Sequence, residues 1–350
     1  MILASTAFAA VQYNITGLGT LGGGSSRPYA VNNSGQVVGF SFVDASVSHA
    51  FLWDDGVMAD LGTLGGAYSS ATDINDAGDV VGVSRISTSS NVRRAFLWRN
   101  GSMADLGTLP SPSGLDYIPY GINASGQVVG HAVTVGVYNY AFLWEGGVMR
   151  KLPVLGDRYS IAYDISGSGV MVGEALLGGA SYSRAFIWQE GVATSLGTLG
   201  GDYSGANAVN EFSQVVGWAS SMPGNYDHAF LWAEGMMTDL GTLGGSRSTA
   251  NDINRNGQVV GNSLVPGGAT HAFLWDKGQM KDLNDLLPPD SGWVLNTANG
   301  INDQGWIVGS GSYLGSPDQG FLLVPEPATL SLLALGGLAL LRRGRPGEFR

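Results

Sequence analysis

Residues 50–82 read AFLWDDGVMADLGTLGGAYSSATDINDAGDVVG and hold one copy of a pattern that fills the chain. Its landmarks are AFLW at 50–53, LGTLGG at 61–66, IN at 74–75 and VVG at 80–82. A fixed period of about 45 residues with about four short strands in each unit is typical of a propeller blade. The pattern therefore predicts an all-β propeller.

Three landmarks can be counted independently along the chain, and each occurs seven times. The aromatic residue of the AFLW segment recurs at Phe51, Phe96, Phe142, Phe186, Phe230 and Phe273, with a degenerate copy at Phe321. The Val-Gly segment ends at Gly39, Gly82, Gly130, Gly173, Gly217, Gly261 and Gly309. The LGTL-type segment begins at Leu18, Leu61, Leu106, Leu152, Leu196, Leu240 and Leu283. The agreement predicts seven blades.

Each unit contains four candidate strands, which we call a to d. Strand a ends at Ile-Asn, strand b is the Gln-Val-Val-Gly run, strand c is the Ala-Phe-Leu-Trp segment, and strand d contains Met-x-Asp-Leu. Strands b and c are almost continuously apolar, as expected for a sheet covered on both faces. Asn-x-x-Gly between strands a and b and x-Gly between strands c and d are turn sequences, so we expect the recurring Asn to be a turn residue.

The two ends of the pattern are complementary. The chain enters at a strand d, before Leu18, and leaves after a strand c, at Val324. Pairing these two strands would complete the last blade and close the ring, which leaves few exposed sheet edges. We therefore predict a seven-bladed propeller over residues 11–324, closed by the N-terminal strand, in preference to an open solenoid with capping repeats.

The His-Ala-Phe strands at His49, His228 and His271 resemble the HAF family of extracellular repeats over residues 11–324. The last unit, with LNDLLPP at 283–289, Trp293 and Asn302, resembles the terminal variant of that family. The resemblance implies an exported bacterial protein whose role is poorly defined. Repeats three and four depart from the common repeat sequence at residues 152–155 and 165–167, which argues against a ligand site that uses every repeat.

Composition narrows the class of partner. The chain has 350 residues, no Cys and a formal net charge of −11. Residues after Val324 contribute four Arg and two Glu, or +2, so the body carries −13. A strongly acidic body argues against a nucleic-acid partner. Without Cys there is neither a disulfide framework nor thiol chemistry.

The C-terminal tail, residues 325–350, has three parts: Pro325-Glu326-Pro327, an apolar run at 328–341, and Arg342-Arg343. This arrangement resembles the PEP-CTERM sorting signal of Gram-negative bacteria. The resemblance implies recognition by an exosortase-type membrane protease, transient anchoring in the inner membrane through a C-terminal apolar helix, and release to the cell surface or extracellular matrix. A plain C-terminal anchor and a buried helix are the alternatives, because the run is shorter than the ~17–25 residues that span a bilayer comfortably.

Residues 1–10 are apolar and contain Ala7-Phe8-Ala9, an A-x-A-like cleavage site, but no Lys or Arg precedes it. We interpret them as the remnant of an export signal. The alternative is that they extend the first strand.

Binding residues are expected where the repeats differ, on the face that carries the b–c and d–a loops. Tyr138, Tyr182 and Tyr226 lie in b–c loops. A ring of positions two residues before the end of strand a contains Tyr29, Thr72, Tyr120, Tyr163, Asn207, Asn251 and Asn299, and we expect it to line the channel mouth. Tyr rings beside amides would suit a sugar. The alternative is that Tyr fills space between blades and Asn bonds to loop backbone.

Metal and catalytic signals are weak. Asp252-x-Asn254-x-Asn256-Gly257 matches half of a calcium loop, but Ser263 stands where the acidic ligand is required, so no metal and no cofactor is predicted. No hydrolase or phosphate-binding motif is present. His131 and Glu174 occupy one repeat slot on adjacent blades, and nothing in the sequence orients them as an acid–base pair.

Two functions remain. The first is an exported, non-enzymatic surface or matrix propeller that binds polysaccharide or protein through its loop face. The second is a polysaccharide lyase or hydrolase, which requires acidic or His side chains that converge on the central channel. The fold alone does not choose between them.

Overall fold

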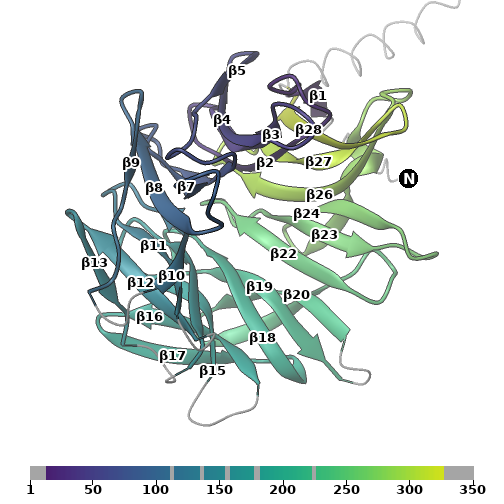
Figure 1. Cartoon of the computed structure of the whole chain (residues 1–350). Helices are drawn as coiled ribbons and strands as arrows, with labels where there is room; N and C mark the ends of the chain where they lie inside the picture. Colours follow the sequence, from purple (N-terminus) through teal and green to yellow (C-terminus); the bar gives the residue numbers. More distant parts are fainter. Residues whose placement is uncertain are drawn as a thin grey trace, which may run out of the picture.

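The computed structural model describes residues 13–110, 114–134, 138–153, 158–176, 182–222 and 226–326. Within these residues the chain forms seven antiparallel sheets of four strands each, arranged around one axis (Figure 1). The predicted seven-bladed, all-β propeller of four-stranded blades is confirmed.

Every sheet follows the a-b-c-d order expected from the repeat. Blade 1 consists of β2 (Ser26–Val31), β3 (Val37–Phe42), β4 (Ser48–Asp54) and β5 (Val57–Asp60). Blade 2 consists of β6 (Ser69–Ile74), β7 (Val80–Arg85), β8 (Arg93–Arg99) and β9 (Ser102–Asp105). Blade 3 consists of β10 (Gly114–Ile122), β11 (Val128–Thr134), β12 (Asn139–Glu145) and β13 (Val148–Lys151). Blade 4 consists of β14 (Ser160–Ile165), β15 (Met171–Leu176), β16 (Ser183–Gln189) and β17 (Val192–Gly197).

Blade 5 consists of β18 (Gly200–Val209), β19 (Val215–Ser221), β20 (Tyr226–Ala233) and β21 (Met236–Gly241). Blade 6 consists of β22 (Ser248–Ile253), β23 (Val259–Leu264), β24 (Thr270–Asp276) and β25 (Gln279–Asp282). Blade 7 consists of β26 (Trp293–Ile301), β27 (Ile307–Tyr313), β28 (Ser316–Pro325) and β1 (Tyr13–Gly17).

The first and last strands of the described chain lie side by side. β1 pairs antiparallel with β28, in a register that runs from Tyr13 opposite Pro325 to Gly17 opposite Phe321. The innermost strands contact one another in succession, from β2 and β6 round to β22 and β26, and β26 contacts β2. A short 3-10 helix, η1 (Leu283–Leu286), follows β25. The C-terminal helix expected at 328–341 lies outside the described residues.

The apolar core is divided among the interfaces between blades. One cluster, for example, joins Val38 and Ala50 of blade 1 to Ala71, Ile74 and Phe96 of blade 2. The strand c Phe is completely buried in every blade, including Phe321 of the degenerate copy. Burial on both faces explains why strands b and c are apolar throughout and do not alternate.

The recurring Asn between strands a and b is a turn residue, as expected, and it also connects blades. Asn32 Oδ1 accepts hydrogen bonds from the backbone N–H of Ser34 and Gln36. Its Nδ2 donates to the backbone carbonyl of Asn75, the equivalent residue of the next blade, at 3.1 Å. The same bond recurs at every interface except that of blades 4 and 5, where Ser166 replaces Asn, and Asn302 donates to the carbonyl of Asn32 at 3.0 Å. Each such bond satisfies two buried polar groups at an interface.

The His of the His-Ala-Phe strands has an architectural role. Nδ1 of His49, His228 and His271 lies 2.8, 2.8 and 2.5 Å from a carboxylate oxygen of Asp60, Asp239 and Asp282, respectively. Each pair joins strand c to strand d of one blade. These three His residues are therefore accounted for by the blade itself.

The invariant Gly at the end of the Val-Val-Gly run is explained by an irregularity in strand a. In blade 2, Ala71 pairs with Gly82 and Asp73 pairs with Val81, so Thr72 is left over as a bulge. The bulge brings the strand a backbone so close that a Cβ on Gly82 would overlap the carbonyl oxygen of Ser70 and the ring of Phe96. The same geometry recurs in every blade, at Gly39, Gly130, Gly173, Gly217, Gly261 and Gly309.

We predict that Gly82→Ala lowers the free energy of unfolding by about 1–3 kcal/mol, the usual cost of overpacking a core. The measurement is urea unfolding followed by tryptophan fluorescence. The matched control is Gly24→Ala, because a Cβ at Gly24 meets no atom within 4 Å and its φ is not positive. A Gly82→Ala protein as stable as the control would show that the bulge does not require glycine opposite it.

Candidate functional site

The residues left over at the bulges form a ring at the centre of the molecule. In every innermost strand the register skips one residue at the same position of the repeat, and β10, β18 and β26 have a further irregularity nearer the loop end. A skipped residue is aimed away from its regular place in the pleat. The seven skipped residues are Tyr29, Thr72, Tyr120, Tyr163, Asn207, Asn251 and Asn299. This is the ring that the sequence analysis identified, although the bulge itself was not foreseen.

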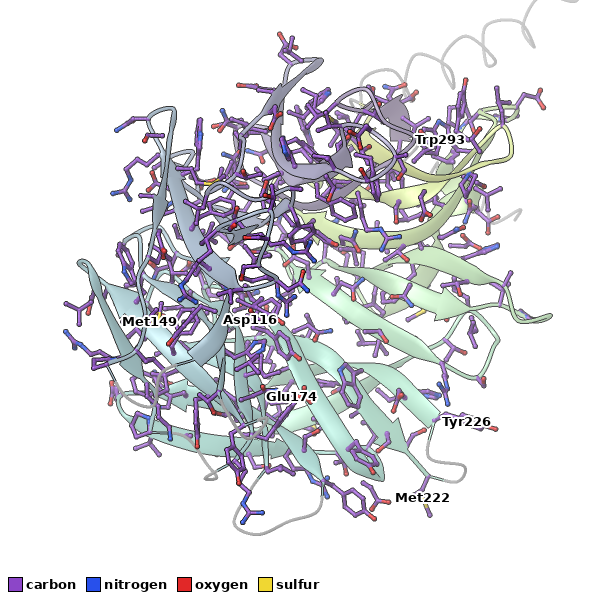
Figure 2. The ribbon with its side chains drawn as sticks, viewed as in Figure 1. Asp116, Met149, Glu174, Met222, Tyr226 and Trp293 are labelled. Carbon is purple, nitrogen blue, oxygen red and sulfur yellow. The ribbon has the colours of Figure 1, made fainter. Side chains whose placement is uncertain are left out.

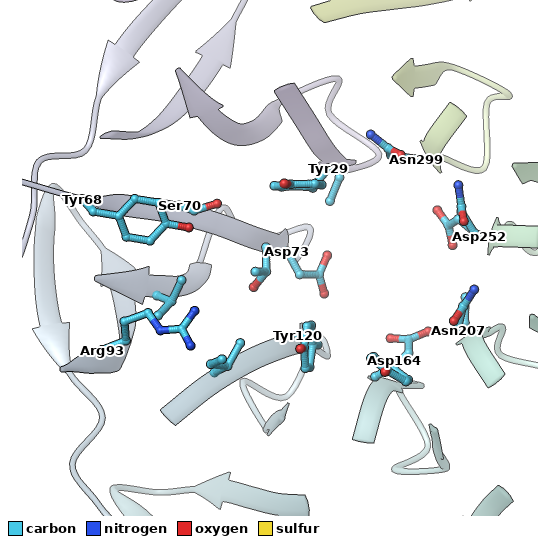
Figure 3. Close-up of a pocket in the computed structure, with 17 residues that line it drawn as sticks. Tyr29, Tyr68, Ser70, Asp73, Arg93, Tyr120, Asp164, Asn207, Asp252 and Asn299 are labelled. Atoms are coloured by element: carbon cyan, nitrogen blue, oxygen red, sulfur yellow. The ribbon is translucent and has the colours of Figure 1, made fainter. Parts of the chain in front are cut away.

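All seven ring residues line one cavity of about 550 Å³, shown in Figure 3. Residues from outside the ring complete the wall, among them Tyr68, Arg93, Asp73, Asp164 and Asp252. The cavity opens on the side of the b–c and d–a loops, because Tyr68 and Arg93 stand at the loop ends of β6 and β8. A volume of this size is typical of pockets that hold small ligands.

The ring has two chemically different halves. Asn207, Asn251 and Asn299 belong to blades 5, 6 and 7, and each donates its Nδ2 to a backbone carbonyl of the next blade at 2.7–2.8 Å. The acceptors are Ala250, Ala298 and Pro28. One of the two N–H groups of each amide is therefore committed to the fold. The second N–H and the side-chain carbonyl oxygen are the groups that each Asn can offer to a ligand.

The other half of the ring consists of three tyrosines and Thr72. The rings of Tyr120 and Tyr163 lie 5.0 Å apart at 59°, which forms a corner of the cavity. Behind them, His131 stacks on Tyr120 with ring centroids 5.6 Å apart and an interplanar angle of 15°. Tyr29 packs against Phe40 at 6.0 Å. The tyrosine faces thus stand on packed supports, which keeps them in place for a ligand.

His131 and Glu174, which occupy the same position of the repeat on adjacent blades, lie behind this wall and are both buried. Glu174 accepts hydrogen bonds from the hydroxyls of Tyr159, Tyr163 and Ser183. Burial lowers the pKa of His131 to about 4, and its Nδ1 has no hydrogen-bond partner among the described residues. No hydrogen bond found within the described chain joins His131 to Glu174, so their arrangement is that of two supports for the tyrosine wall.

Sequence reasoning missed the role of three aspartates. The position after each ring residue contains Ala30, Asp73, Gly121, Asp164, Ala208, Asp252 and Gly300, an alternation of small residues and Asp round the channel. That alternation could have revealed the role of the aspartates. It is missed when Asp252 is considered only as the first residue of a partial calcium-loop motif. Around the described residues no group of His, Asp or Glu is placed to hold a metal ion.

Each aspartate bonds two blades together. Asp164 Oδ1 accepts the N–H of Ile165 at 2.7 Å, and its Oδ2 accepts the N–H of Val209, in the next blade, at 2.8 Å. Asp73 and Asp252 make the same pair of bonds, with the cross-blade N–H supplied by Ile122 and Ile301. These carboxylates therefore act first as hydrogen-bonded links between neighbouring blades, which we call clasps.

The same aspartates have raised pKa values. Burial in the surrounding protein raises the pKa of Asp164 to about 7 and that of Asp252 to about 6, against the two backbone N–H bonds, which favour the charged form. Burial and the negative charge of Asp164 raise the pKa of Asp73 well above its usual value. The three side chains keep partial contact with the channel, so this burial is not complete exclusion of water.

Arg93 is the one cationic side chain among the described residues that line the cavity. Its Nε and Nη2 donate to Asp116 Oδ2 at 3.1 and 2.8 Å, and its backbone N–H donates to Asp116 Oδ1. The pair links blade 2 to blade 3 and cancels most of the guanidinium charge.

The three loop tyrosines predicted as ligand residues do not join this cavity. Tyr138 packs against Tyr140 and Arg158, Tyr182 against Tyr203, and Tyr226 against Arg247. Figure 2 shows Tyr226 near the rim of the disc, apart from Asp116 and Glu174. The structure thus does not bring the ring and these loop tyrosines together in one cavity, and a ligand role for Tyr138, Tyr182 and Tyr226 stays a prediction.

The opposite end of the channel holds a second hollow of about 420 Å³, lined by the a–b turns. Asp76, Glu211 and Asp303 reach its rim, and each accepts a backbone N–H from the preceding blade, donated by Asn33, Gly167 and Arg255 respectively. These side chains serve the same purpose as the turn Asn residues.

The predicted sorting motif lies largely beyond the described residues. Pro325 is the last residue of β28 and Glu326 follows it, whereas Pro327, Arg342 and Arg343 lie outside, as do residues 1–10. Among the helices of the described residues, none has the length and apolar character needed to cross a membrane.

Comparison with known proteins identifies the architecture but no activity. A family described as a protein of unknown function, DUF3466, matches residues 156–326, just under half of the chain. No curated protein matches.

Solved structures that resemble the chain include the β-propeller domain of the Trilobed protease from Pyrococcus furiosus, with 12% identity, 76% of this chain and 86% of that chain covered, and a TM-score of 0.53. Another is YCF48 bound to D1 peptide, with 13% identity, coverage of 90% and 96%, and a TM-score of 0.52. A third is a puromycin-hydrolyzing peptidase from Mycobacterium tuberculosis, with 14% identity, 76% of this chain and 45% of that chain covered, and a TM-score of 0.50. At such low identity these similarities establish the fold alone.

We predict that Asp164 makes the protein less stable as pH rises. A carboxyl whose folded pKa of about 7 exceeds its unfolded value of 3.8 binds its proton more tightly in the folded state. Its stabilising contribution is fully present below pH ~4 and is lost as pH rises through ~7. We expect the melting temperature of the wild type to fall between pH 5 and pH 8 relative to that of Asp164→Asn.

His131 acts in the opposite direction below its unfolded pKa of 6.5, and the comparison between wild type and variant cancels its effect. Asp55→Asn, at an exposed turn where φ is 44°, is the matched control and should follow the wild type. Identical pH profiles for the wild type and Asp164→Asn would contradict the raised pKa.

Proposed function

We propose that the chain is an exported, non-enzymatic propeller that binds polysaccharide through the cavity at the loop end of its channel. The observation that carries this proposal is the convergence of the seven bulge residues on one cavity at a place where the repeats differ. Positions that serve the blade alone, such as the strand c Phe, are the same in nearly every copy. The residues of the tyrosine half have no such uniformity.

The chemistry of the cavity supports a sugar-like ligand. Tyrosine provides a flat apolar face with a polar edge, and sugar rings present apolar C–H faces between hydroxyl groups. The tyrosines share the cavity with the carbonyl oxygens of three Asn side chains and with three carboxyl groups, all of which accept hydrogen bonds from hydroxyls. Within this proposal, a protein that binds the same loop face is the alternative to a polysaccharide ligand.

The remaining parts of the proposal concern export and closure. The pairing of β1 with β28 supports a ring fastened by the N-terminal strand. Pro325-Glu326-Pro327, the apolar run and Arg342-Arg343 support recognition by an exosortase-type membrane protease, transient membrane anchoring and delivery to the surface of a Gram-negative bacterium. Glu326 directly follows the last strand, so a cut there would release the whole propeller.

A second candidate, a polysaccharide lyase or hydrolase, is favoured by one observation. Asp164, with a pKa of about 7, lies in the cavity wall, and such a carboxyl can exchange a proton at neutral pH. Both of its oxygens are held by backbone N–H groups, which favours the structural role. Product release from bound polymer, measured beside binding, separates the two candidates.

We predict that Tyr120→Ala and Tyr163→Ala each weaken binding of the full chain to extracted matrix polysaccharide by about tenfold, which corresponds to about 1.4 kcal/mol. The loss follows from removal of the stacking surface. Phe212→Ala is the matched control, because Phe212 is 65% exposed and belongs to an a–b turn at the other end of the channel. The measurement is a glycan array followed by titration calorimetry. Equal affinities for the tyrosine variants and the control would remove this cavity as the binding site.

We also predict that replacing Pro325, Glu326 and Pro327 with alanine retains the protein in the membrane fraction of a host that has an exosortase-type protease. The wild type should appear in the medium or on the surface, because the protease would recognise the motif. Pro346→Ala, a tail proline outside the motif, serves as the control. Equal release of all three proteins, measured by fractionation and immunoblotting, would refute the sorting role.

A further inference from the structure

The charge balance of the central cavity distinguishes among sugar ligands. Its wall contains Asp73, Asp164 and Asp252, and the Arg93 that also lines it is tied to Asp116 by two side-chain bonds. In addition to burial, the charges of Asp164 and Asp252 raise the pKa of Asp73, and that of Asp252 raises the pKa of Asp164, so the negative potential of one carboxylate reaches its neighbours across the channel. Figure 3 shows the three aspartates directed toward the middle of the cavity from different blades. A positive charge placed there would favour the ionised form of all three carboxyl groups, so a bound cation would lower their raised pKa values and be attracted to the carboxylates that form.

The tyrosines of the same wall favour the same sign of charge. The face of a tyrosine ring carries the negative part of its quadrupole and attracts a cation within about 6 Å of its centre. Tyr120 and Tyr163 meet at a corner, with ring centroids 5.0 Å apart. Tyr29, from blade 1, lines another part of the same wall. Aromatic faces beside carboxylates are the usual environment of a bound ammonium group.

A bare metal ion fits this wall less well than an organic cation. Both oxygens of each aspartate already accept backbone N–H groups, and the three residues come from blades 2, 4 and 6. Within the described chain these carboxylates do not form a set of metal ligands. An ammonium group binds through its N–H donors and its charge and needs no converging inner-shell ligands, so it can bind without disturbing the clasps between blades.

We propose that the cavity selects glycans that carry free amino groups, with the ammonium held between the tyrosine corner and the aspartates of the channel. This inference rests on the proposed polysaccharide-binding function and names its ligand class. The sugar ring stacks on tyrosine, and its ammonium donates hydrogen bonds to carboxylate and Asn side-chain oxygens. Acetylation of the amine removes the charge and adds bulk, so the acetylated glycan loses both attractions.

The experiment compares three trisaccharides on the full chain by titration calorimetry at pH 6.5 and low salt: glucosamine, N-acetylglucosamine and glucose. We expect the glucosamine trimer to bind at least about tenfold more tightly than the other two. Asp252→Asn should reduce this preference several-fold, and Asp55→Asn, which removes the same charge from an exposed turn, should leave it unchanged. Circular dichroism verifies that each variant is folded.

The outcomes separate this inference from the function on which it rests. If the three trimers bind equally, or the acetylated or neutral trimer binds best, selectivity for amino sugars is overturned and polysaccharide binding stands. If no trimer and no polymer on the glycan array binds, both are overturned. If Asp252→Asn does not fold, the preference of the wild type among the three trimers still decides the question.

Discussion

The structure depends on one extra residue in the innermost strand of every blade. Because strand a holds one residue more than strand b can pair at this point of the repeat, a side chain in each blade is displaced from the ladder toward the axis. The displacement requires glycine on strand b, where a Cβ would strike the strand a carbonyl, and the strand c Phe then covers that glycine. The Val-Val-Gly and Ala-Phe landmarks are thus two consequences of one irregularity. A regular ladder would free both positions and would remove the ring of residues from the channel.

The interfaces between blades are fastened by interchangeable polar clasps. Asp73, Asp164 and Asp252 fasten blades 2 to 3, 4 to 5 and 6 to 7, while ring Asn residues fasten 5 to 6, 6 to 7 and 7 to 1. Within the described residues, the interfaces 1 to 2 and 3 to 4 have neither clasp at this level, and there the ring residues are Tyr29 and Tyr120. The circle of turn Asn bonds is interrupted at Ser166, and there Glu211 accepts the N–H of Gly167. Tyr29 and Tyr120 therefore occupy the positions that the clasps leave available, whereas Tyr163 lies beside the clasp of Asp164.

The sequence was sufficient for the fold because the fold is repetitive. Seven copies of each landmark determine blade number and strand order, and the turn chemistry of Asn and Gly determines where strands end. The ring of seven channel residues could be predicted from alignment of the copies alone. The commitment of the Asn donors could not, because their partners lie about 43–47 residues away in the next blade. The absence of Tyr138, Tyr182 and Tyr226 from the cavity wall could not be predicted either, because the repeat does not determine the direction of its variable loops.

The aspartates show why a structural role and a ligand role can coexist in one side chain. Two backbone N–H bonds favour the charged carboxylate, and burial, joined in Asp73 and Asp164 by repulsion from other channel aspartates, opposes it. Burial outweighs the hydrogen bonds in Asp164 and Asp252, whose pKa values rise to about 7 and 6. Such a group gains or loses its proton near neutral pH, so a new charge nearby changes its ionisation, whereas a fully exposed carboxylate would be screened by water. The clasps that hold the blades together thereby place responsive carboxyl groups in the wall that they share with the tyrosines.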